Sequence, residues 1–307
     1  MISNSREADA QALRTAMKGW GTDEGTLIKL TASRSSAERM KIREAYTSSF
    51  GRDLIQDLDG ELSGHLKDAM IGLWRSPIEF DAAEIYRACK GMGTNEDTLN
   101  EIIGSRSNYR LLEIKKVYQK MYGEDLDQRI KGETSGHYEK LLISILQGKR
   151  DESSNVNSSQ VQQDVVDLYN AGENKWGTDE SIFNRIFALR SPTHLYQLNL
   201  KYLESHGKDL LAVVDSEFSG NLKNLLKTIL HAHINPADYF ADRIYTACKG
   251  WGTNDHSLIR AIITIDEAFL SQVKTIYPTK YKMTLEDQIR GETSGDYQTL
   301  LLEVVKN

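Results

Sequence analysis

The stretch Met17-Lys18-Gly19-Trp20-Gly21-Thr22 ends in a Gly-Thr pair that is followed by two polar residues, and this pattern occurs three more times along the chain. A second pattern, Glu-x-Ser-Gly, also occurs four times, and its glutamate follows the glycine of the Gly-Thr pair by 40 residues in every copy. Two motifs that keep one register through four copies indicate an internal structural repeat. The other pairs are Gly93-Thr94, Gly177-Thr178 and Gly252-Thr253, and the matching glutamates are Glu61, Glu133, Glu217 and Glu292.

A chain of 307 residues exceeds the usual size of a single core, so several modules or a repeat array are expected. The motifs divide it into four repeats. A stretch rich in Ser, Asn and charge, residues 149–159, separates the second repeat from the third. We expect it to be a linker that divides the chain into two pairs of repeats. The predicted repeats are 5–75, 77–148, 160–235 and 236–307.

The apolar residues inside a repeat recur at helical spacing, as Leu111, Ile114, Tyr118 and Met121 do in the second repeat. The chain has only four prolines, which also favours helices. We therefore predict an all-α fold with about five short helices in each repeat. The residues expected to be helix N-caps are Thr22, Thr94, Thr178 and Thr253.

The net charge of −6 restricts the possible partners. A chain of this charge is repelled by nucleic acid and by anionic lipid, so we expect no nucleic-acid binding, and a membrane role needs a bridging cation. Cys89 and Cys248, the two cysteines, are expected to be free thiols in a reducing, cytoplasmic setting. There is no apolar run of the roughly 18 residues that span a bilayer, and no signal peptide is visible, so a membrane protein of this kind lies on the surface.

The spacing of the two motifs fits calcium coordination. Glycines two residues apart allow backbone conformations that turn several carbonyls inward. Calcium accepts about 6–8 oxygens, including carbonyls and bidentate carboxylates. Three loop carbonyls and both oxygens of one glutamate supply five ligand oxygens, which leaves coordination positions for water or a lipid phosphoryl oxygen. We expect this glutamate at the start of a helix on a neighbouring loop. The alternative is that Gly-x-Gly-Thr is only a turn between helices and Glu-x-Ser-Gly only a capping motif.

Large apolar residues occupy the tips of the glycine loops: Trp20, Met92, Trp176 and Trp251. Tryptophan favours the membrane interface, so we expect these side chains to contact the membrane, although they could instead pack on their own helices. Basic residues flank the loops and could contact headgroups, or could be solvated surface charge. They are Lys18, Lys90 and Lys249, with Arg52 and Lys208 in the partner loops.

The pattern Met-Lys-Gly-x-Gly-Thr, followed after 40 residues by Glu-x-Ser-Gly and repeated four times, closely resembles the annexin family. The resemblance covers nearly the whole chain. It implies four repeats of five helices that form a curved disc with calcium loops on its convex face. It also implies four ligand sets: Met17, Gly19, Gly21 and Glu61; Cys89, Gly91, Gly93 and Glu133; Gly172, Lys175, Gly177 and Glu217; Cys248, Gly250, Gly252 and Glu292.

The chain departs from the annexin pattern in two places. The Ser-Arg-Ser pattern around Arg34 and Arg106, which reads Leu-Arg-Ser at Arg190, becomes Thr264-Ile265-Asp266 in the fourth repeat, so the role of that arginine is open there. Only a few residues precede the first repeat, so we expect no tail of the kind that recruits partner proteins in some annexins.

We interpret the chain as a non-catalytic protein that binds acidic, phosphatidylserine-type phospholipid membranes in a calcium-dependent way. We expect it to be cytoplasmic, reversibly peripheral on membranes, and able to self-associate there. A calcium-regulated scaffold that binds cytoskeleton or sulphated glycans is the alternative. An enzyme is disfavoured because the seven histidines form no zinc-binding spacing and no nucleophile motif is present.

Overall fold

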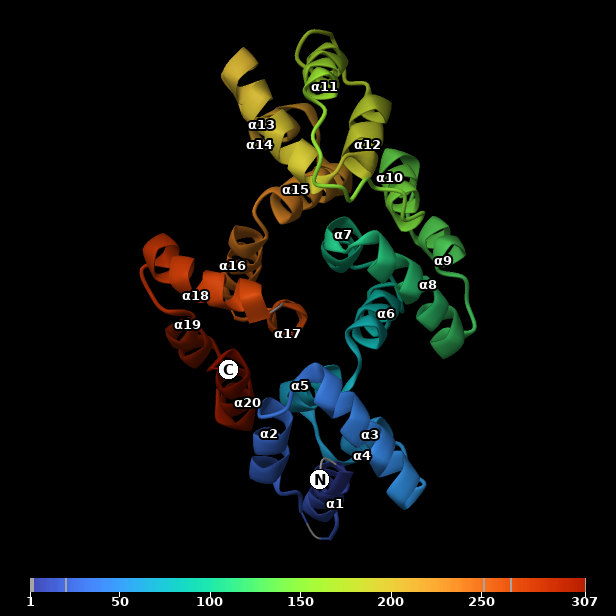
Figure 1. The fold of residues 1–307 in the computed structure, drawn as a ribbon, viewed down its shortest axis with the longest axis vertical. Coiled ribbons are helices and arrows are strands. Elements are labelled where there is room, and N and C mark those ends of the chain that lie inside the picture. Colours follow the sequence, from blue (N-terminus) through green and yellow to red (C-terminus); the bar gives the residue numbers. More distant parts are fainter. Residues whose placement is uncertain (1–2, 20, 251, 266, 307) are drawn as a thin grey trace. The chain divides into compact units, whose positions relative to one another are not determined.

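The computed structural model describes residues 3–19, 21–250, 252–265 and 267–306, and these residues form twenty α-helices and no strand (Figure 1). The predicted all-α fold is confirmed, with five helices in each repeat. The first repeat contains α1 (Ser3–Ala16), α2 (Glu24–Ala32), α3 (Ser36–Phe50), α4 (Leu54–Glu61) and α5 (Gly64–Trp74). The second contains α6 (Pro77–Ala88), α7 (Glu96–Ser105), α8 (Asn108–Tyr122), α9 (Leu126–Glu133) and α10 (Gly136–Leu146).

The third and fourth repeats follow the same order of helices. The third contains α11 (Ser158–Ala171), α12 (Glu180–Leu189), α13 (Pro192–His206), α14 (Leu210–Glu217) and α15 (Gly220–Ile234). The fourth contains α16 (Pro236–Cys248), α17 (Asp255–Thr264), α18 (Glu267–Tyr281), α19 (Leu285–Glu292) and α20 (Gly295–Lys306). Within the described residues, none of these helices combines the length and the apolar character that a bilayer crossing requires.

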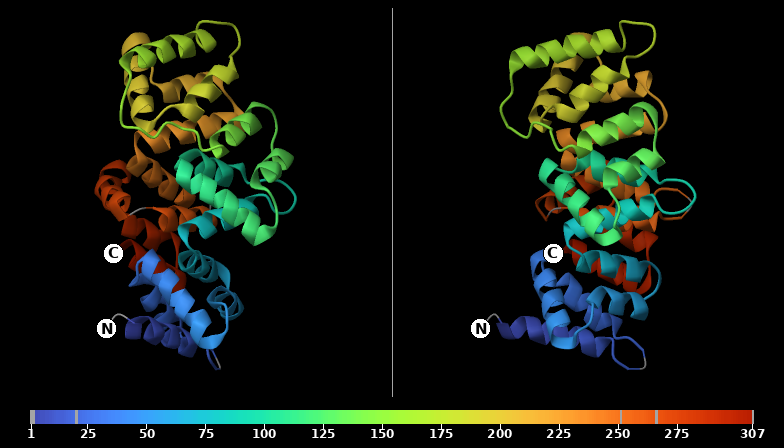
Figure 2. Two further views of the ribbon diagram at one scale, coloured as in Figure 1. Left: turned by 45° about the vertical axis from the view of Figure 1, so that its right-hand side comes forward. Right: turned by 90° about the vertical axis from the view of Figure 1, so that its right-hand side faces the viewer.

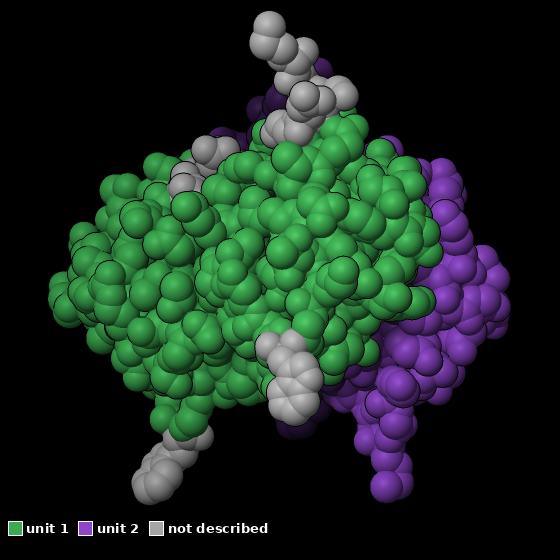
Figure 3. Space-filling model, turned by 90° about the horizontal axis from the view of Figure 1, so that it is seen from below, with its two compact units in different colours: residues 1–80, 240–307 green, residues 81–239 purple. Residues whose placement is uncertain are grey.

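The chain folds into two compact units, and they do not follow the predicted pairing of the repeats (Figure 3). Unit 1 comprises residues 1–80 and 240–307, and unit 2 comprises residues 81–239. The first repeat therefore pairs with the fourth, and the second with the third. The prediction that residues 149–159 separate the two pairs is wrong, because these residues lie entirely within unit 2.

The linker is attached to unit 2 by hydrogen bonds to the end of α12. The amide of Asp151 donates to the carbonyl of Leu189 at 2.8 Å, and the guanidinium of Arg150 donates to the carbonyl of Arg190, also at 2.8 Å. Although its composition is typical of a flexible connection, the segment is thus held as part of the packed unit.

The second and fifth helices of each repeat make the contacts between the two repeats of a unit. In unit 1, α2 packs on α20 and α5 on α17; in unit 2, α7 packs on α15 and α10 on α12. Glycine permits the close approach of these helices. A Cβ atom at Gly72 in α5 would lie 2.6 Å from Ile263 of α17, and one at Gly104 in α7 would lie 3.1 Å from Thr228 of α15. A larger residue at either position would force the neighbouring side chains to shift.

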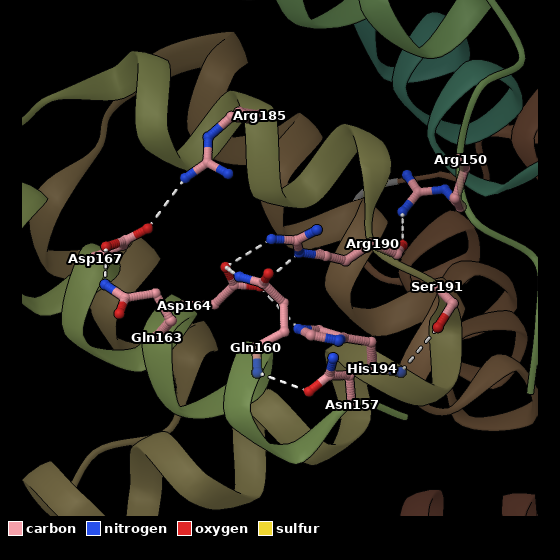
Figure 4. A network of polar contacts seen from close by, with 10 residues as sticks. All are labelled: Arg150, Asn157, Gln160, Gln163, Asp164, Asp167, Arg185, Arg190, Ser191 and His194. Carbon is pink, nitrogen blue, oxygen red and sulfur yellow. Dashed lines mark hydrogen bonds and ion pairs between the residues drawn. The ribbon is translucent and has the colours of Figure 1, made fainter. Parts of the chain in front are cut away.

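An ion pair with a buried aspartate joins the first helix to the end of the second helix in three repeats. Arg34 pairs with Asp9 at 2.8 Å, Arg106 with Asp81 at 3.0 Å, and Arg190 with Asp164 at 2.6 Å. Figure 4 shows that the Asp164 carboxylate also accepts hydrogen bonds from Gln160 and lies 2.8 Å from the ring of His194. The arginine of the Ser-Arg-Ser pattern therefore neutralises a buried aspartate.

The fourth repeat replaces both members of this pair. Ile265 stands where the arginine would be, and Phe240 stands eight residues before Cys248, where the other repeats have aspartate. Phe240 is buried. Since a buried charge without its partner is costly, loss of the arginine together with the aspartate preserves the fold.

Candidate calcium-binding loops

Each predicted calcium loop joins the first helix of a repeat to the second, and one backbone hydrogen bond closes it. The amide that closes the loop belongs to Asp23, Asn95, Asp179 or Asn254, and it donates to the carbonyl of the last alanine of the preceding helix at 2.7–2.9 Å. In the right-hand view of Figure 2, the α6–α7 loop and the α11–α12 loop project from the same side of unit 2.

The N-caps of the second helices are these same Asp and Asn residues. The side chain of Asp23 accepts from the amide of Thr26, for example, and that of Asn254 accepts from the amide of Ser257. The prediction that Thr22, Thr94, Thr178 and Thr253 cap the helices is therefore wrong by one residue. An Asp or Asn side chain is at least as good a cap as threonine, and its use leaves the threonine hydroxyl available for another partner.

That partner is the glutamate of the Glu-x-Ser-Gly motif. The threonine hydroxyl donates to a glutamate oxygen at 3.3 Å in Thr22–Glu61, 2.7 Å in Thr94–Glu133, and 2.8 Å in both Thr178–Glu217 and Thr253–Glu292. The 40-residue spacing thus brings the carboxylate to the loop, as the sequence predicted.

The glutamates end helices and do not start them. They are the last residues of α4, α9, α14 and α19, which corrects the expected position at a helix start. A carboxylate at this end of a helix faces the negative end of the helix dipole, and a nearby cation relieves that repulsion. The position therefore favours a cation beside the glutamate.

In the first three repeats the serine of the Glu-x-Ser-Gly motif is not a side-chain cap. Ser63, Ser135 and Ser219 occupy the N-cap positions of α5, α10 and α15, and none of these described serines makes a side-chain capping hydrogen bond. This observation counts against the alternative that the motif exists only to start the fifth helix.

The loop glycines are required by the backbone conformation. Gly19 and Gly21 have φ of 120° and 85°, and Gly250 and Gly252 have φ of 120° and 84°. These values lie in the left-handed region, which other residues rarely adopt. A Cβ atom at these positions would contact nothing within 4 Å, so conformation and not crowding selects glycine.

The third loop uses a glycine for a different reason. Gly172 has φ of −121°, but a Cβ atom there would lie 3.3 Å from the side chain of Glu217. Its carbonyl accepts a hydrogen bond from the amide of Lys175 at 3.0 Å, which leaves one lone pair of that oxygen for a metal. Gly177, at φ of 81°, is the loop's left-handed glycine.

The second loop contains a cation that belongs to the chain. The guanidinium of Arg129 donates to the carbonyl of Cys89 and lies 3.1 Å from the carboxylate of Glu133. Both oxygens are predicted calcium ligands, so a loop carbonyl and the glutamate converge on one point in the folded chain. Sequence reasoning missed Arg129, although its place four residues before Glu133 on one helix was visible.

The large apolar side chains at the tips of the second and third loops are exposed to solvent. Met92 and Trp176 are fully exposed, at 106% and 102% relative accessibility, so neither packs on its own helices. Trp20 and Trp251 lie outside the described residues. Trp74, in contrast, is buried in α5 and donates to the hydroxyl of Thr31.

The basic residues expected to contact membranes form contacts within the chain. Arg52 lies 2.8 Å from Asp57, and Lys208 lies 2.6 Å from Glu173 in the third loop. The hydrogen bond to Glu173 raises the pKa of Lys208. Lys90 and Lys249 lie over the rings of Tyr86 and Tyr245. All four side chains are partly or fully exposed, so they remain within reach of a docked surface.

The two cysteines that begin the second and fourth loops are buried free thiols. Burial, followed by the negative charge of Glu133, raises the pKa of Cys89 to about 11. Burial and Glu292 raise the pKa of Cys248 to about 12. These thiols stay protonated near neutral pH, so only their backbone carbonyls are candidate ligands.

The four five-helix repeats, each with a loop threonine bonded to a distant glutamate, define a class of all-α repeat proteins with equivalent loop sites. The chain belongs to the annexin family, whose model matches residues 8–73, 80–145, 163–229 and 239–304. Annexin A7 of Homo sapiens is 44% identical over 97% of this chain, which spans 61% of that protein. Annexin A5 of Homo sapiens is 42% identical over 96% of the chain and 92% of its own length. The solved structure of annexin III superimposes with a TM-score of 0.95, at 37% identity, over 98% of this chain and 94% of its own.

The residues of the first, third and fourth loops fit calcium. Each offers a carboxylate that a threonine holds beside exposed loop backbone, and hard oxygen donors are the ligands calcium prefers. Arg129 in the second loop marks the point where such donors converge, because it stands as a cation between them.

Proposed function

We propose that this chain binds acidic phospholipid membranes, of phosphatidylserine type, when calcium is bound at the loops of the first, third and fourth repeats. The supporting observation is the hydrogen bond from each loop threonine to a glutamate 39 residues away. The proposed ligands are the carbonyls of Met17, Gly19 and Gly21 with Glu61; those of Gly172, Lys175 and Gly177 with Glu217; and those of Cys248, Gly250 and Gly252 with Glu292.

Each proposed site offers too few protein oxygens to complete the coordination of a calcium ion. Three carbonyls and one carboxylate provide at most five oxygens, fewer than the roughly 6–8 that calcium accepts. Calcium, when bound, would supply open positions to lipid phosphoryl oxygens. Three doubly charged ions would also cancel the chain's net charge of −6 and remove its repulsion from an anionic surface.

Trp176 and Met92 would enter the interfacial layer of the membrane, because their side chains project fully into solvent from the loop tips. Trp20 and Trp251 are proposed to do the same from their sequence positions. Arg52 and Lys208 would contact headgroups of an anionic surface in exchange for their ion pairs with Asp57 and Glu173.

Sedimentation with vesicles tests the proposal. The chain should pellet with phosphatidylserine vesicles in calcium, remain in the supernatant with chelator, and bind phosphatidylcholine vesicles weakly. The triple variant Glu61→Gln, Glu217→Gln, Glu292→Gln should lose binding, because an amide is a poorer calcium ligand than a carboxylate. Asp215→Asn, an exposed change two residues from Glu217, is the matched control. Pelleting that chelator does not reverse would reject the proposal.

Two further parts of the proposal concern the cell. Reversible attachment predicts a cytoplasmic protein that moves to membranes when calcium rises. Docking concentrates molecules on a surface, and several weak sites acting together favour association there. Energy transfer between labelled molecules on vesicles should therefore rise with calcium, and an unchanged signal at saturating binding would exclude self-association.

A further inference from the structure

The guanidinium of Arg129 stands where the ligands of the second calcium loop converge. It donates to the carbonyl of Cys89, lies 3.1 Å from Glu133, and lies 3.8 Å from Glu124. The Arg129 side chain is 28% exposed and that of Glu133 is 22% exposed, so the contact is only partly screened by solvent. Two of the four ligands expected for calcium are thus already bound to a positive charge.

The other repeats have no cation at the equivalent place, four residues before the glutamate. Asp57 stands there in the first repeat and accepts a hydrogen bond from the hydroxyl of Tyr46 at 2.6 Å. Gln288 stands there in the fourth and accepts from the hydroxyl of Tyr277 at 3.4 Å. Val213, which is buried, stands there in the third.

A tyrosine close to the position four residues before the glutamate also distinguishes the second repeat from the first and fourth. Tyr46, Tyr118, Tyr202 and Tyr277 each precede the glutamate of their repeat by 15 residues. The hydroxyls of Tyr46 and Tyr277 donate to the residue at this position, whereas the buried hydroxyl of Tyr118 has no hydrogen-bond partner among the described residues. Arginine has no acceptor, so Arg129 cannot accept a hydrogen bond from the Tyr118 hydroxyl as Asp57 and Gln288 do from their tyrosines. Its guanidinium donates to the loop carbonyl of Cys89 instead.

A tethered guanidinium competes strongly with a free ion for these oxygens. Arginine is always charged at physiological pH, and its planar set of donors can bridge a carbonyl and a carboxylate at once. Its attachment to α9 keeps it beside the site at a high effective concentration. A calcium ion at the same point would also meet like charge a few ångströms away.

We propose that Arg129 takes the place of calcium in the second loop, so that this loop keeps its form without metal while the first, third and fourth loops bind calcium. This inference rests on the proposed function, and it replaces the expectation of a calcium ion at Cys89, Gly91, Gly93 and Glu133. Gly91 and Gly93, with φ of 103° and 90°, keep the conformation of the other loops. The exposed Met92 is thereby presented whether or not calcium is present.

Counting bound calcium on the full chain by equilibrium dialysis tests the inference. The wild type should bind three ions, and Arg129→Gln, which copies Gln288 of the fourth repeat, should bind four. Glu133→Gln should leave the wild-type number unchanged but remove the added ion from Arg129→Gln. Lys131→Gln removes the same charge from an exposed position of α9 and should bind three.

Arg129→Val, which copies Val213 of the third repeat, serves if Arg129→Gln does not fold. The inference is overturned if Glu133→Gln lowers the wild-type number by one, or if neither Arg129 variant gains an ion. A wild type that binds no calcium would reject the proposed function itself, whereas a wild type that binds four would reject only the role of Arg129.

Discussion

The hydroxyl of Thr178 donates a hydrogen bond of 2.8 Å to the carboxylate of Glu217, and the same bond of 2.8 Å joins Thr253 to Glu292. This hydrogen bond connects the loop before the second helix of a repeat to the end of the fourth helix of the same repeat. Because the hydroxyl occupies one lone pair of one oxygen, the carboxylate is oriented while its other lone pairs stay available. The threonine is therefore a positioning residue for a proposed metal ligand.

Thr178→Val should weaken calcium binding at the third loop by about tenfold, the lower end of what loss of a supporting hydrogen bond costs a metal site. Isothermal titration calorimetry would measure the change. Thr193→Val, at an exposed position in α13, is the control and should bind calcium as the wild type does. Equal affinities for the two variants would contradict the positioning role.

Gly172→Ala should also weaken the third site. The new methyl group would lie 3.3 Å from the Glu217 side chain, so the carboxylate must shift. Gly132→Ala adds the same methyl group to α9 where nothing lies within 4 Å, and it should leave calcium binding at the third loop intact. The measurement is a calcium titration of each variant; unaltered affinity in Gly172→Ala would show that Glu217 does not need its present position.

Asp81→Asn should destabilise the chain by about 3–5 kcal/mol, because it leaves the buried charge of Arg106 without its partner. Asp81 also pairs with Arg110 at 2.6 Å. Glu204→Gln, which breaks the exposed pair with Lys201, should cost less than about 1 kcal/mol. Urea unfolding measures both changes. A similar small loss for both variants would mean that the buried pair contributes little.

The buried aspartates should make the fold sensitive to acid. Burial alone would raise the pKa of Asp81, but attraction to Arg106 and Arg110 outweighs it and holds that pKa below its ordinary value. The pKa of Asp164 is likewise held low, because contacts with Arg190, Gln160 and His194 outweigh burial. Each stabilising contribution is therefore complete above the unfolded-state value of about 4 and is lost as the pH falls through the folded-state pKa.

The free energy of unfolding should accordingly decline below about pH 4, and Asp81→Asn should make this decline shallower. Urea titrations between pH 7 and pH 3 provide the measurement. Glu204→Gln is again the control, since its partner pair is exposed. An acid decline as steep in Asp81→Asn as in Glu204→Gln would assign the sensitivity to other groups.

Trp176 should report membrane docking by a blue shift in its fluorescence, because a fully exposed ring would move into the interfacial layer. In the variant Trp20→Phe, Trp251→Phe, the remaining tryptophans are Trp176 and the buried Trp74. A calcium-dependent shift with phosphatidylserine vesicles then belongs to Trp176. Trp176→Ala should weaken binding, whereas Tyr109→Ala, an exposed change on α8, should not. No shift despite sedimentation would place Trp176 outside the membrane.

The amino-acid sequence was enough to predict the repeats, the all-helical fold and the pairing of each loop with its glutamate. These follow from periodicities within one repeat: the helical spacing of apolar residues, and the 40 residues that separate Gly177 from Glu217. Such local patterns can be recognised in the sequence without knowing which segments pack against them.

Packing in three dimensions determines which repeats pair, which residue caps the second helices, and what Arg129 contacts. The contact of α2 with α20 joins opposite ends of the chain, and no local pattern specifies it. Asp23 caps α2 because the hydroxyl of Thr22 is used by Glu61, which is distant in sequence. In the sequence, Arg129 is one of many cations expected on a helix surface. The folded chain places its guanidinium at the carbonyl of Cys89, which lies 40 residues earlier. These outcomes depend on which groups compete for a partner in space, and that competition is absent from the linear chain.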